Sequence, residues 1–363
     1  MKKLVHEGIR KLVPYPPGKP IEELEREFGI HGSIKLASNE NPLGPSPEAI
    51  RAIKNRISSL NRYPDGSAYY MKEALSRKYG ISPEEIIVGN GSDEILELVI
   101  RTFFLYGDHA VQSFPTFLVY EKIIMGAGGN ISSVPLANFG VDLEKMLKAI
   151  TPETKVIFIN NPNNPTGSAL FREELLDFLQ QVPDDIVIVL DEAYIEFARD
   201  KRIANGLELV KHHPLLIVLR TFSKLYGLAG LRIGYGFASK EMIDYMNRIR
   251  QPFNVNSLAQ AAAVAALADS DFVSKTIELT NSGLEYLFRE LDSMGIKYHP
   301  TQTNFFLIKV PGGGDSVYNK MLEYGVIVRS MSSYGLSDYI RINVGLPEEN
   351  ERFIETFKKV LKK

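Results

Sequence analysis

One lysine of this chain is placed where it could act as a nucleophile. Lys224 lies in the segment TFSKLYGLAGLR (residues 221–232), which follows the apolar run of residues 215–219. That run is too short for a helix and predicts a buried strand, and open α/β sheets bind ligands beyond the carboxyl ends of their strands. Burial can lower the pKa of a lysine enough to expose a neutral amine, which forms Schiff bases. Because most loop lysines are solvated charges, a role for Lys224 depends on what lies at the other strand ends.

A glycine-rich turn, GNGSDE (residues 89–94), follows a second apolar run. Its glycines permit a tight backbone, and the free N–H groups of the helix that starts at Ser92 suit a phosphate. A plain strand-to-helix turn with Ser92 or Asp93 as its N-cap explains the pattern equally well. Glu94 stands where a dinucleotide fingerprint requires its third glycine, which disfavours a nicotinamide-dependent dehydrogenase.

Two more strand ends carry polar residues. Residues 160–167 (NNPNNPTG) place asparagines before prolines in a rigid turn that presents amide donors and acceptors. Asp191 follows the apolar run of residues 186–190, where a carboxylate is costly unless it meets a cation or a metal. Magnesium is the alternative partner, but no second carboxylate motif supports it and we expect no metal. Arg232 adds a second cation eight residues after Lys224.

These features together fit one cofactor. A phosphate cradle, amide donors, a buried acid, a lysine and an arginine match the needs of pyridoxal 5'-phosphate. That molecule carries a phosphate, a phenolic oxygen, a ring nitrogen and an aldehyde. The sequence therefore predicts pyridoxal 5'-phosphate as the cofactor.

The elements that must position these residues alternate along the chain. Apolar strands are predicted near residues 85–88, 109–112, 131–135, 155–159, 185–190 and 215–219, with helical patterns between most of them. This alternation predicts an α/β fold with a mostly parallel central sheet and helices on both faces. We expect an N-terminal arm and short helix over residues 1–38, a large cofactor-binding domain over 39–265 and a smaller α+β domain over 266–363. Strands of the small domain are expected at residues 298–310, 326–329 and 339–344.

Composition and charge exclude several classes of protein. The 363 residues are 44% hydrophobic and 24% charged, as in an ordinary globular protein, and the net charge of -2 gives no basic footprint for nucleic acid. Cysteine is absent, which excludes disulfides and thiolate catalysis. The first ten residues lack the apolar core of a secretory signal, and no stretch approaches the ~20 residues of a membrane span. We therefore expect a cytoplasmic protein without a nucleic-acid or membrane partner.

The sequence resembles the histidinol-phosphate aminotransferase family, whose members are class I/II, fold-type I aminotransferases. The matching positions span nearly the whole chain and comprise residues 39–42 (NENP), 62–65 (RYPD), 89–94, 161–167, 191–194 (DEAY) and 221–232, with Arg329 and Arg341. The resemblance implies a fold-type I pyridoxal-phosphate-dependent transferase. It also implies transamination between L-glutamate and imidazole-acetol phosphate, giving L-histidinol phosphate and 2-oxoglutarate in histidine biosynthesis.

The resemblance implies catalytic roles for three residues. Lys224 would bind the cofactor covalently and then move the proton between the substrate Cα and the cofactor C4′. Asp191 would pair with the pyridine nitrogen and keep it protonated, while Tyr194 and Asn164 would hydrogen-bond the phenolic oxygen. The other cofactor-binding positions would be Gly91, Ser92, Asp93, Phe117, Thr221, Ser223 and Arg232, together with Tyr63 from a second subunit. The role of Tyr63 requires a homodimer.

The resemblance also implies which residues bind the substrate. Arg341 matches the carboxylate-binding arginine, and its guanidinium offers a bidentate fork to either a carboxylate or a phosphate. Arg329 would bind the distal carboxylate of glutamate or the phosphate. Tyr15 would fold over the site, and Asn39 and Asn164 complete the predicted set.

Phe117 departs from the family pattern, because many members have a tyrosine stacked on the pyridine ring. Stacking needs only the aromatic face, so we expect the cofactor still to bind. His212 and His213, which precede Pro214, are predicted to form a solvated turn and not a metal site.

Three other functions remain alternatives. An aromatic amino acid aminotransferase would use the same lysine and aspartate and would differ around Tyr15, Phe117, Asn304 and Arg329. A lyase of the threonine-phosphate decarboxylase type would break a different bond at Cα, a choice that depends on substrate orientation. A non-catalytic pyridoxal-phosphate-binding protein is disfavoured, because every expected catalytic position is filled.

Overall fold

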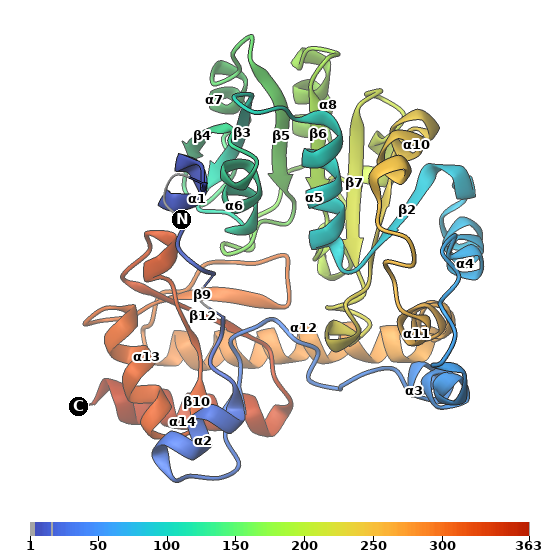
Figure 1. Cartoon of the computed structure of the whole chain (residues 1–363). Coiled ribbons are helices and arrows are strands. Elements are labelled where there is room, and N and C mark those ends of the chain that lie inside the picture. The colour runs from blue at the N-terminus through green and yellow to red at the C-terminus, as the bar shows by residue number, and fades with distance from the viewer. Residues whose placement is uncertain (1–3, 16, 363) are drawn as a thin grey trace.

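A computed structural model describes residues 4–15 and 17–362 of the chain, and its largest sheet has seven strands in the order β2-β8-β7-β6-β5-β3-β4 (Figure 1). The strands are β2 (Ile86–Gly89), β3 (His109–Phe114), β4 (Asn130–Pro135), β5 (Thr154–Asn160), β6 (Val187–Asp191), β7 (Leu216–Thr221) and β8 (Gly234–Phe237). Neighbours pair in parallel except where β8 lies antiparallel between β2 and β7. The predicted α/β fold with a mostly parallel central sheet is confirmed.

β8 is the strand of this sheet that the sequence analysis missed. Its sequence, GYGF, is short and half glycine, a composition that gives little strand signal. The glycines are required by packing, since a Cβ on Gly234 would lie 2.4 Å from the backbone nitrogen of Ser92. A Cβ on Gly236 would lie 2.9 Å from the Leu219 side chain. Close approach to the start of a helix and to β7 therefore explains why this strand lacks larger side chains.

Helices cover both faces of the large sheet. The elements around it are α3 (Pro47–Arg56), α4 (Tyr69–Tyr79), α5 (Ser92–Phe103), α6 (Val119–Gly126), α7 (Leu143–Lys148), α8 (Arg172–Gln181), α9 (Gly206–Leu209), α10 (Lys240–Ile249) and α11 (Ser257–Ala268). Alternate strand residues enter different cores, as the strand period of two requires. Val187 and Val189 of β6 pack in the core that contains residues of α5, α6 and α10, whereas Ile188 and Leu190 pack in the core that contains residues of α7 and α8. By this alternation Asp191, at the end of β6, faces the side of α5 and α6.

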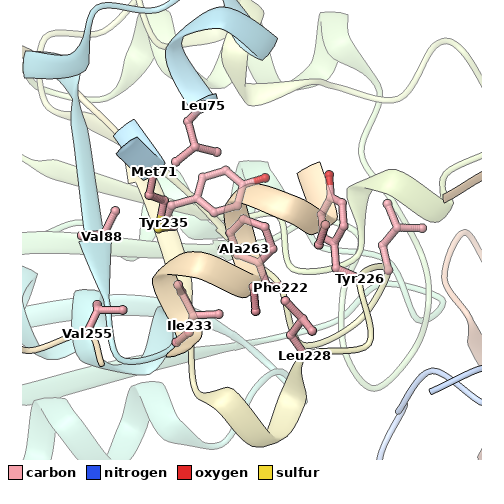
Figure 2. Close-up of a cluster of buried hydrophobic side chains, with 14 of the residues drawn as sticks. Met71, Leu75, Val88, Phe222, Tyr226, Leu228, Ile233, Tyr235, Val255 and Ala263 are labelled. Carbon is pink, nitrogen blue, oxygen red and sulfur yellow. The ribbon is translucent and has the colours of Figure 1, made fainter. Parts of the chain in front are cut away.

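A third core fixes the segment that carries Lys224. Figure 2 shows Phe222, Tyr226 and Leu228 packed among side chains of α4, α11 and β8. Each of the three is at most 2% exposed. The lysine segment is thus anchored by apolar side chains on both sides of the lysine itself.

The C-terminal part forms a second, smaller α+β unit. Its elements are α12 (Ser270–Ser293), β9 (Phe305–Lys309), α13 (Gly314–Glu323), β10 (Val326–Ile327), β11 (Arg329–Ser330), β12 (Tyr339–Asn343) and α14 (Pro347–Leu361). Strands β11, β12 and β9 make an antiparallel sheet. The helix α12 runs from the end near α11 towards this small sheet (Figure 1).

The N-terminal segment contacts both parts of the molecule. It contains α1 (Glu7–Lys11), α2 (Ile21–Phe28) and β1 (Ile34–Lys35), and β1 pairs in parallel with β10. Five short 3-10 helices complete the described elements: η1 (Ile57–Ser59), η2 (Pro83–Glu85), η3 (Ile195–Phe197), η4 (Ala229–Leu231) and η5 (Ser332–Tyr334). The domain boundaries after residues 38 and 265 stay a prediction.

Two strand predictions in the C-terminal part were partly wrong. The predicted strand at residues 298–310 is regular only in β9, and Tyr298 forms an isolated bridge with Ile308. Between them the backbone turns, because Thr301 and Thr303 accept hydrogen bonds from nearby backbone N–H groups at 3.1 and 3.2 Å. The predicted strand at residues 326–329 divides into β10 and β11, which pair in different sheets.

Candidate active site

A cavity of about 180 Å³ lies where β5, β6 and β7 end. Ten predicted cofactor or substrate residues line it: Ser92, Asp93, Phe117, Asn164, Asp191, Tyr194, Thr221, Ser223, Lys224 and Arg232. They come from segments that follow five different strands, β2, β3, β5, β6 and β7. Since these strands are parallel, the sheet brings their carboxyl ends to one edge, as ligand sites of open α/β sheets require.

Lys224 stands in this cavity in a state suited to a nucleophile. Its Nζ donates a hydrogen bond of 3.3 Å to the Ser38 carbonyl oxygen and lies 5.7 Å from the centroid of the Tyr194 ring. Burial, and secondarily the charge of Arg341, lowers the pKa of Lys224 to about 8. A sizeable neutral fraction of the amine is therefore available near neutral pH.

Asp191 is a buried carboxylate held by two donors. It is 4% exposed; its Oδ1 accepts from the Ala193 N–H at 3.1 Å and its Oδ2 accepts from the Tyr120 hydroxyl at 2.6 Å. Burial raises the pKa of Asp191 to about 6, although both hydrogen bonds oppose the rise. A cationic group in the cavity would favour the ionised form.

A polar network joins the cavity to the small sheet. Asn39 donates through Nδ2 to the Tyr194 hydroxyl at 2.9 Å, and burial raises the pKa of Tyr194 to about 12. Arg341, which is 5% exposed, donates to Asn164 Oδ1 and, at 2.8 Å, to the Ala37 carbonyl oxygen. Arg341 Nε and Asn39 Oδ1 are buried without a hydrogen-bond partner in the described residues. Buried polar atoms in this state are suited to a ligand.

The start of α5 forms an anion cradle. Gly91 has φ 81°, and a Cβ there would lie 2.8 Å from Arg232 Nη2, so the backbone approaches the guanidinium closely. Arg232 itself has φ 54° and pairs with Asp93 at 3.2 Å. A left-handed conformation is costly for arginine and persists where the surroundings fix it, often at functional sites. Ser92 and the free N–H groups of the first turn of α5 complete a site that suits a phosphate.

Arg329 and Tyr15 lie beside this site and not in its cavity wall. Arg329 of β11 is the register partner of Arg341 of β12, so the two arginines share one face of the small sheet. The guanidinium carbon of Arg329 is 5.8 Å from the centroid of the Tyr15 ring. Tyr15 belongs to the arm and is 41% exposed. The arm and the small sheet thus bring a second cation next to Arg341.

Tyr63 is not brought to the cavity of its own chain. It is 83% exposed and stacks on Phe253, with ring centroids 4.7 Å apart. Phe253 is itself 44% exposed. The pair therefore presents aromatic surface outwards.

Several cavity residues were missed by the sequence analysis. Asn160 accepts from the Asn164 N–H at 2.7 Å through Oδ1 and donates to the Asp191 carbonyl oxygen at 3.0 Å through Nδ2. It lies in the asparagine-rich turn and could have been named from it. Ser38, Glu40, Ala193 and Ala229 also line the cavity. Tyr120, which bonds Asp191, lies inside an apolar helical pattern that carries no signal of such a role.

The prediction of a solvated turn at the paired histidines was wrong for one of them. His213 is 2% exposed, and its Nδ1 accepts from the Leu215 N–H at 3.2 Å, which anchors the start of β7. Burial lowers the pKa of His213. Across residues 4–15 and 17–362, no three histidine, aspartate or glutamate side chains gather as a metal ion would require. Over the same residues, no helix has both the length and the apolar character to cross a membrane.

The structure combines a mostly parallel sheet with a lysine after β7, a buried aspartate after β6 and an anion cradle at α5. This combination defines a fold-type I, pyridoxal-phosphate-dependent enzyme. Residues 32–357 match the family model described as aminotransferase class I and II. The chain belongs to this family and, within it, to the histidinol-phosphate aminotransferases, as the following relatives show.

Relatives named histidinol-phosphate aminotransferase match nearly the full length of this chain. The protein from Desulfotalea psychrophila is 46% identical over 361 residues, which cover 99% of this chain and 95% of the relative. The protein from Moorella thermoacetica is 46% identical over 356 residues, covering 98% and 92%. A crystal structure of histidinol-phosphate aminotransferase from Sinorhizobium meliloti, in complex with pyridoxal-5'-phosphate, superposes with a TM-score of 0.90. It has 29% sequence identity and covers 98% of this chain and 97% of the other.

The residues of this chain fit the cofactor. The cradle at Gly91 would be filled by any side chain there, Asp191 is a buried acid that gains from a cationic ring nitrogen, and Lys224 is a partly neutral amine. Phe117 lines the same cavity. The enzyme is accordingly a pyridoxal-phosphate-dependent aminotransferase.

Proposed function

We propose that this enzyme transfers the amino group of L-glutamate to imidazole-acetol phosphate, giving 2-oxoglutarate and L-histidinol phosphate in histidine biosynthesis. The observation that carries the proposal is the register pair of Arg329 and Arg341 beside the cavity. Glutamate carries two carboxylates, whereas histidinol phosphate carries a phosphate and no carboxylate. Two adjacent guanidinium groups suit both substrates, because each can form a fork with either anion. The name histidinol-phosphate aminotransferase, which the 46%-identical relatives carry, supports the histidinol phosphate half of this pair.

The proposed roles of the catalytic residues follow from their environments. The cofactor, when bound, supplies an electron sink for the bond that breaks at the substrate Cα. Lys224 Nζ takes the proton from that carbon, which its lowered pKa permits near neutral pH. Asp191 would hold the ring nitrogen of the bound cofactor in its protonated form. Tyr194 and Asn164 would donate hydrogen bonds to its phenolic oxygen.

The remaining predicted positions bind and orient. Gly91, Ser92, Asp93, Thr221, Ser223 and Arg232 form or support the phosphate cradle, and Phe117 offers a ring face to the cofactor. Arg341 binds the anion next to the reacting carbon, Arg329 binds the distal anion, and Tyr15 covers the site from the arm. Asn39 orients Tyr194 through their 2.9 Å hydrogen bond.

We also propose a homodimer in which Tyr63 completes the partner's phosphate site. Exposed large side chains gather on neighbouring segments of this region: Ile57, Leu60, Tyr63, Tyr69, Tyr70 and Phe253 are 44–83% exposed. Apolar surface of this kind is typical of interfaces. Sedimentation would give the mass of a dimer, and Tyr63→Phe should weaken cofactor binding without changing that mass.

We propose the cytoplasm as the location, because glutamate and 2-oxoglutarate are metabolites of that compartment. Fractionation of the source cells would test this, and recovery of the enzyme outside the cytoplasmic fraction would contradict it.

A single-turnover absorbance experiment tests the substrate. The cofactor-loaded enzyme is mixed with L-histidinol phosphate or with L-phenylalanine, and the loss of the visible cofactor band is followed. We expect rapid bleaching with histidinol phosphate and slow bleaching with phenylalanine. The reverse order would make the enzyme an aromatic amino acid aminotransferase.

A further inference from the structure

One buried group at the site has no part in the proposed function. Tyr120 of α6 is 0% exposed, and its hydroxyl lies 2.6 Å from Asp191 Oδ2. Its ring stacks on Phe158 at a centroid distance of 4.8 Å and meets the edge of Phe117 at 5.6 Å. Aromatic packing on both sides therefore fixes where the hydroxyl points.

The Tyr120 hydroxyl stabilises the ionised form of Asp191 more than any other side chain does. In the described residues its carboxylate accepts two hydrogen bonds, from Tyr120 and from the Ala193 N–H. Burial and the nearby charges of Asp93 and Glu192 all raise the pKa of Asp191, whereas the Tyr120 bond is the largest influence that lowers it. Burial and the Asp191 charge raise the pKa of Tyr120 well above its usual value, so the hydroxyl keeps its proton and always donates.

We propose that Tyr120 is a positioning residue that keeps the Asp191 carboxylate ionised and oriented for the cofactor ring nitrogen. The inference rests on the proposed role of Asp191 and is independent of the substrate. Phe117 lies just before α6 (Val119–Gly126) and Tyr120 is the second residue of that helix. The Tyr120 N–H donates to the Phe117 carbonyl oxygen at 3.2 Å, so one turn of the chain positions both the ring that lines the cavity and the donor to Asp191.

A neutral donor is the group that this position needs. A lysine or arginine would also keep Asp191 ionised, but it would satisfy the carboxylate with a full positive charge and compete with the protonated ring nitrogen. A buried carboxylate with no side-chain donor would instead tend to take up a proton. The tyrosine hydroxyl favours the ionised form while leaving the negative charge available to the cofactor.

The test is the affinity of the apoprotein for pyridoxal 5'-phosphate in Tyr120→Phe, measured across pH 5 to 9 by absorbance titration. Loss of the donor raises the pKa of Asp191, so the carboxylate stays protonated to higher pH. We expect the affinity at pH 7 to fall about tenfold, equivalent to about 1.4 kcal/mol, and to recover at higher pH. Asp93, Glu192 and Tyr194, the other titratable groups near this pair, are unchanged in the variant.

The matched control is Tyr235→Phe. Tyr235 is also 0% exposed, and its hydroxyl pairs with that of Tyr79 at 2.9 Å, away from Asp191. This variant removes a buried hydroxyl of the same kind and should leave the pH profile of cofactor affinity unchanged. An equal shift in both variants would mean that any lost buried hydroxyl loosens the site, and it would overturn the proposal.

A double-mutant cycle separates positioning from a structural effect. If Tyr120 acts through the Asp191 charge, Tyr120→Phe should cost little further affinity in an Asp191→Asn background, because no charge remains to protect. A tenfold loss in that background would overturn the proposal, as would a Tyr120→Phe profile identical to that of the parent. No amino-acid substrate enters the measurement, so an error in the substrate assignment would not affect its outcome.

Discussion

The floor of the site and its mouth are built in different ways. The floor consists of the strand-end residues that line the cavity, such as Asp191 and Thr221, in segments attached to one seven-stranded sheet with apolar cores on both faces. The mouth consists of Tyr15, Arg329 and Arg341, which come from the arm and from the small sheet. The floor is therefore fixed within one body and suits a resident cofactor. The mouth joins segments distant in the chain and suits substrates that must enter and leave.

The largest expected effect is on the floor. Lys224→Ala should lower turnover at least about 10⁴-fold, because it removes both the nucleophile and the proton acceptor. The fold should be kept, since Phe222, Tyr226 and Leu228 still anchor the segment. Steady-state assays combined with circular dichroism check this, and transamination that survives in a folded variant would remove the central role of Lys224.

The floor should also carry an electrostatic cost that a bound cofactor relieves. The pKa of Asp191 rises from 3.8 to about 6 on folding, so this group favours the folded state below pH 4 and loses that contribution as the pH rises through 6. The rise corresponds to about 3 kcal/mol. In the apoprotein, Asp191→Asn should therefore gain up to about 3 kcal/mol of unfolding free energy over the parent between pH 4 and pH 8.

Urea unfolding of both apoproteins at several pH values measures this difference. The sign of the difference is specific. If the folded surroundings instead stabilised the ionised carboxylate, Asp191→Asn would have a lower free energy of unfolding than the parent at high pH. A difference in unfolding free energy that is constant with pH would show that burial does not raise the pKa of Asp191 in the apoprotein.

Local sequence signals indicate the floor better than the mouth. Lys224, Asp191 and the GNGSDE turn each end a strand or open a helix, and they could be named from the sequence itself. Phe117, Thr221 and Ser223 were named only through the family resemblance. The partner of Asp191 was missed, since Tyr120 is 71 positions away in the chain and only packing brings it there. The short strand β8 was missed because its glycines follow from close approach to Ser92 and Leu219, which no local pattern reveals.

The mouth could not be predicted from local signals at all. Arg329 and Arg341 were named only through a family resemblance, and their pairing depends on the register of β11 with β12. Asn39 is held by Asn343 across 304 positions of the chain, through a 3.0 Å hydrogen bond from its backbone N–H. Contacts of this kind are tertiary, and neither periodicity nor turn chemistry encodes them.

In the mouth, the two arginines should differ in strength. Arg341→Gln should lower kcat/KM about 100-fold for both glutamate and histidinol phosphate, because it removes a nearly buried charge-assisted fork. Arg329→Gln should cost about tenfold, mainly through KM, since Arg329 lies outside the cavity wall. Steady-state kinetics with both amino donors measures these losses. Equal losses of kcat/KM in the two variants would contradict the prediction, because they would mean that the two arginines contribute equally to substrate binding.

The smallest effect should come from Phe117, a floor position that the sequence predicted to differ from the family pattern. Phe117→Tyr adds a hydroxyl at the edge of a ring that lines the cavity, and stacking uses only the face of a ring. Cofactor affinity should therefore stay within about twofold, and kcat/KM for histidinol phosphate within about threefold. The added hydroxyl could instead change the ratio of kcat/KM for histidinol phosphate and phenylalanine by more than tenfold. Phe117 would then determine substrate specificity, and it would have to be counted with the mouth and not with the floor.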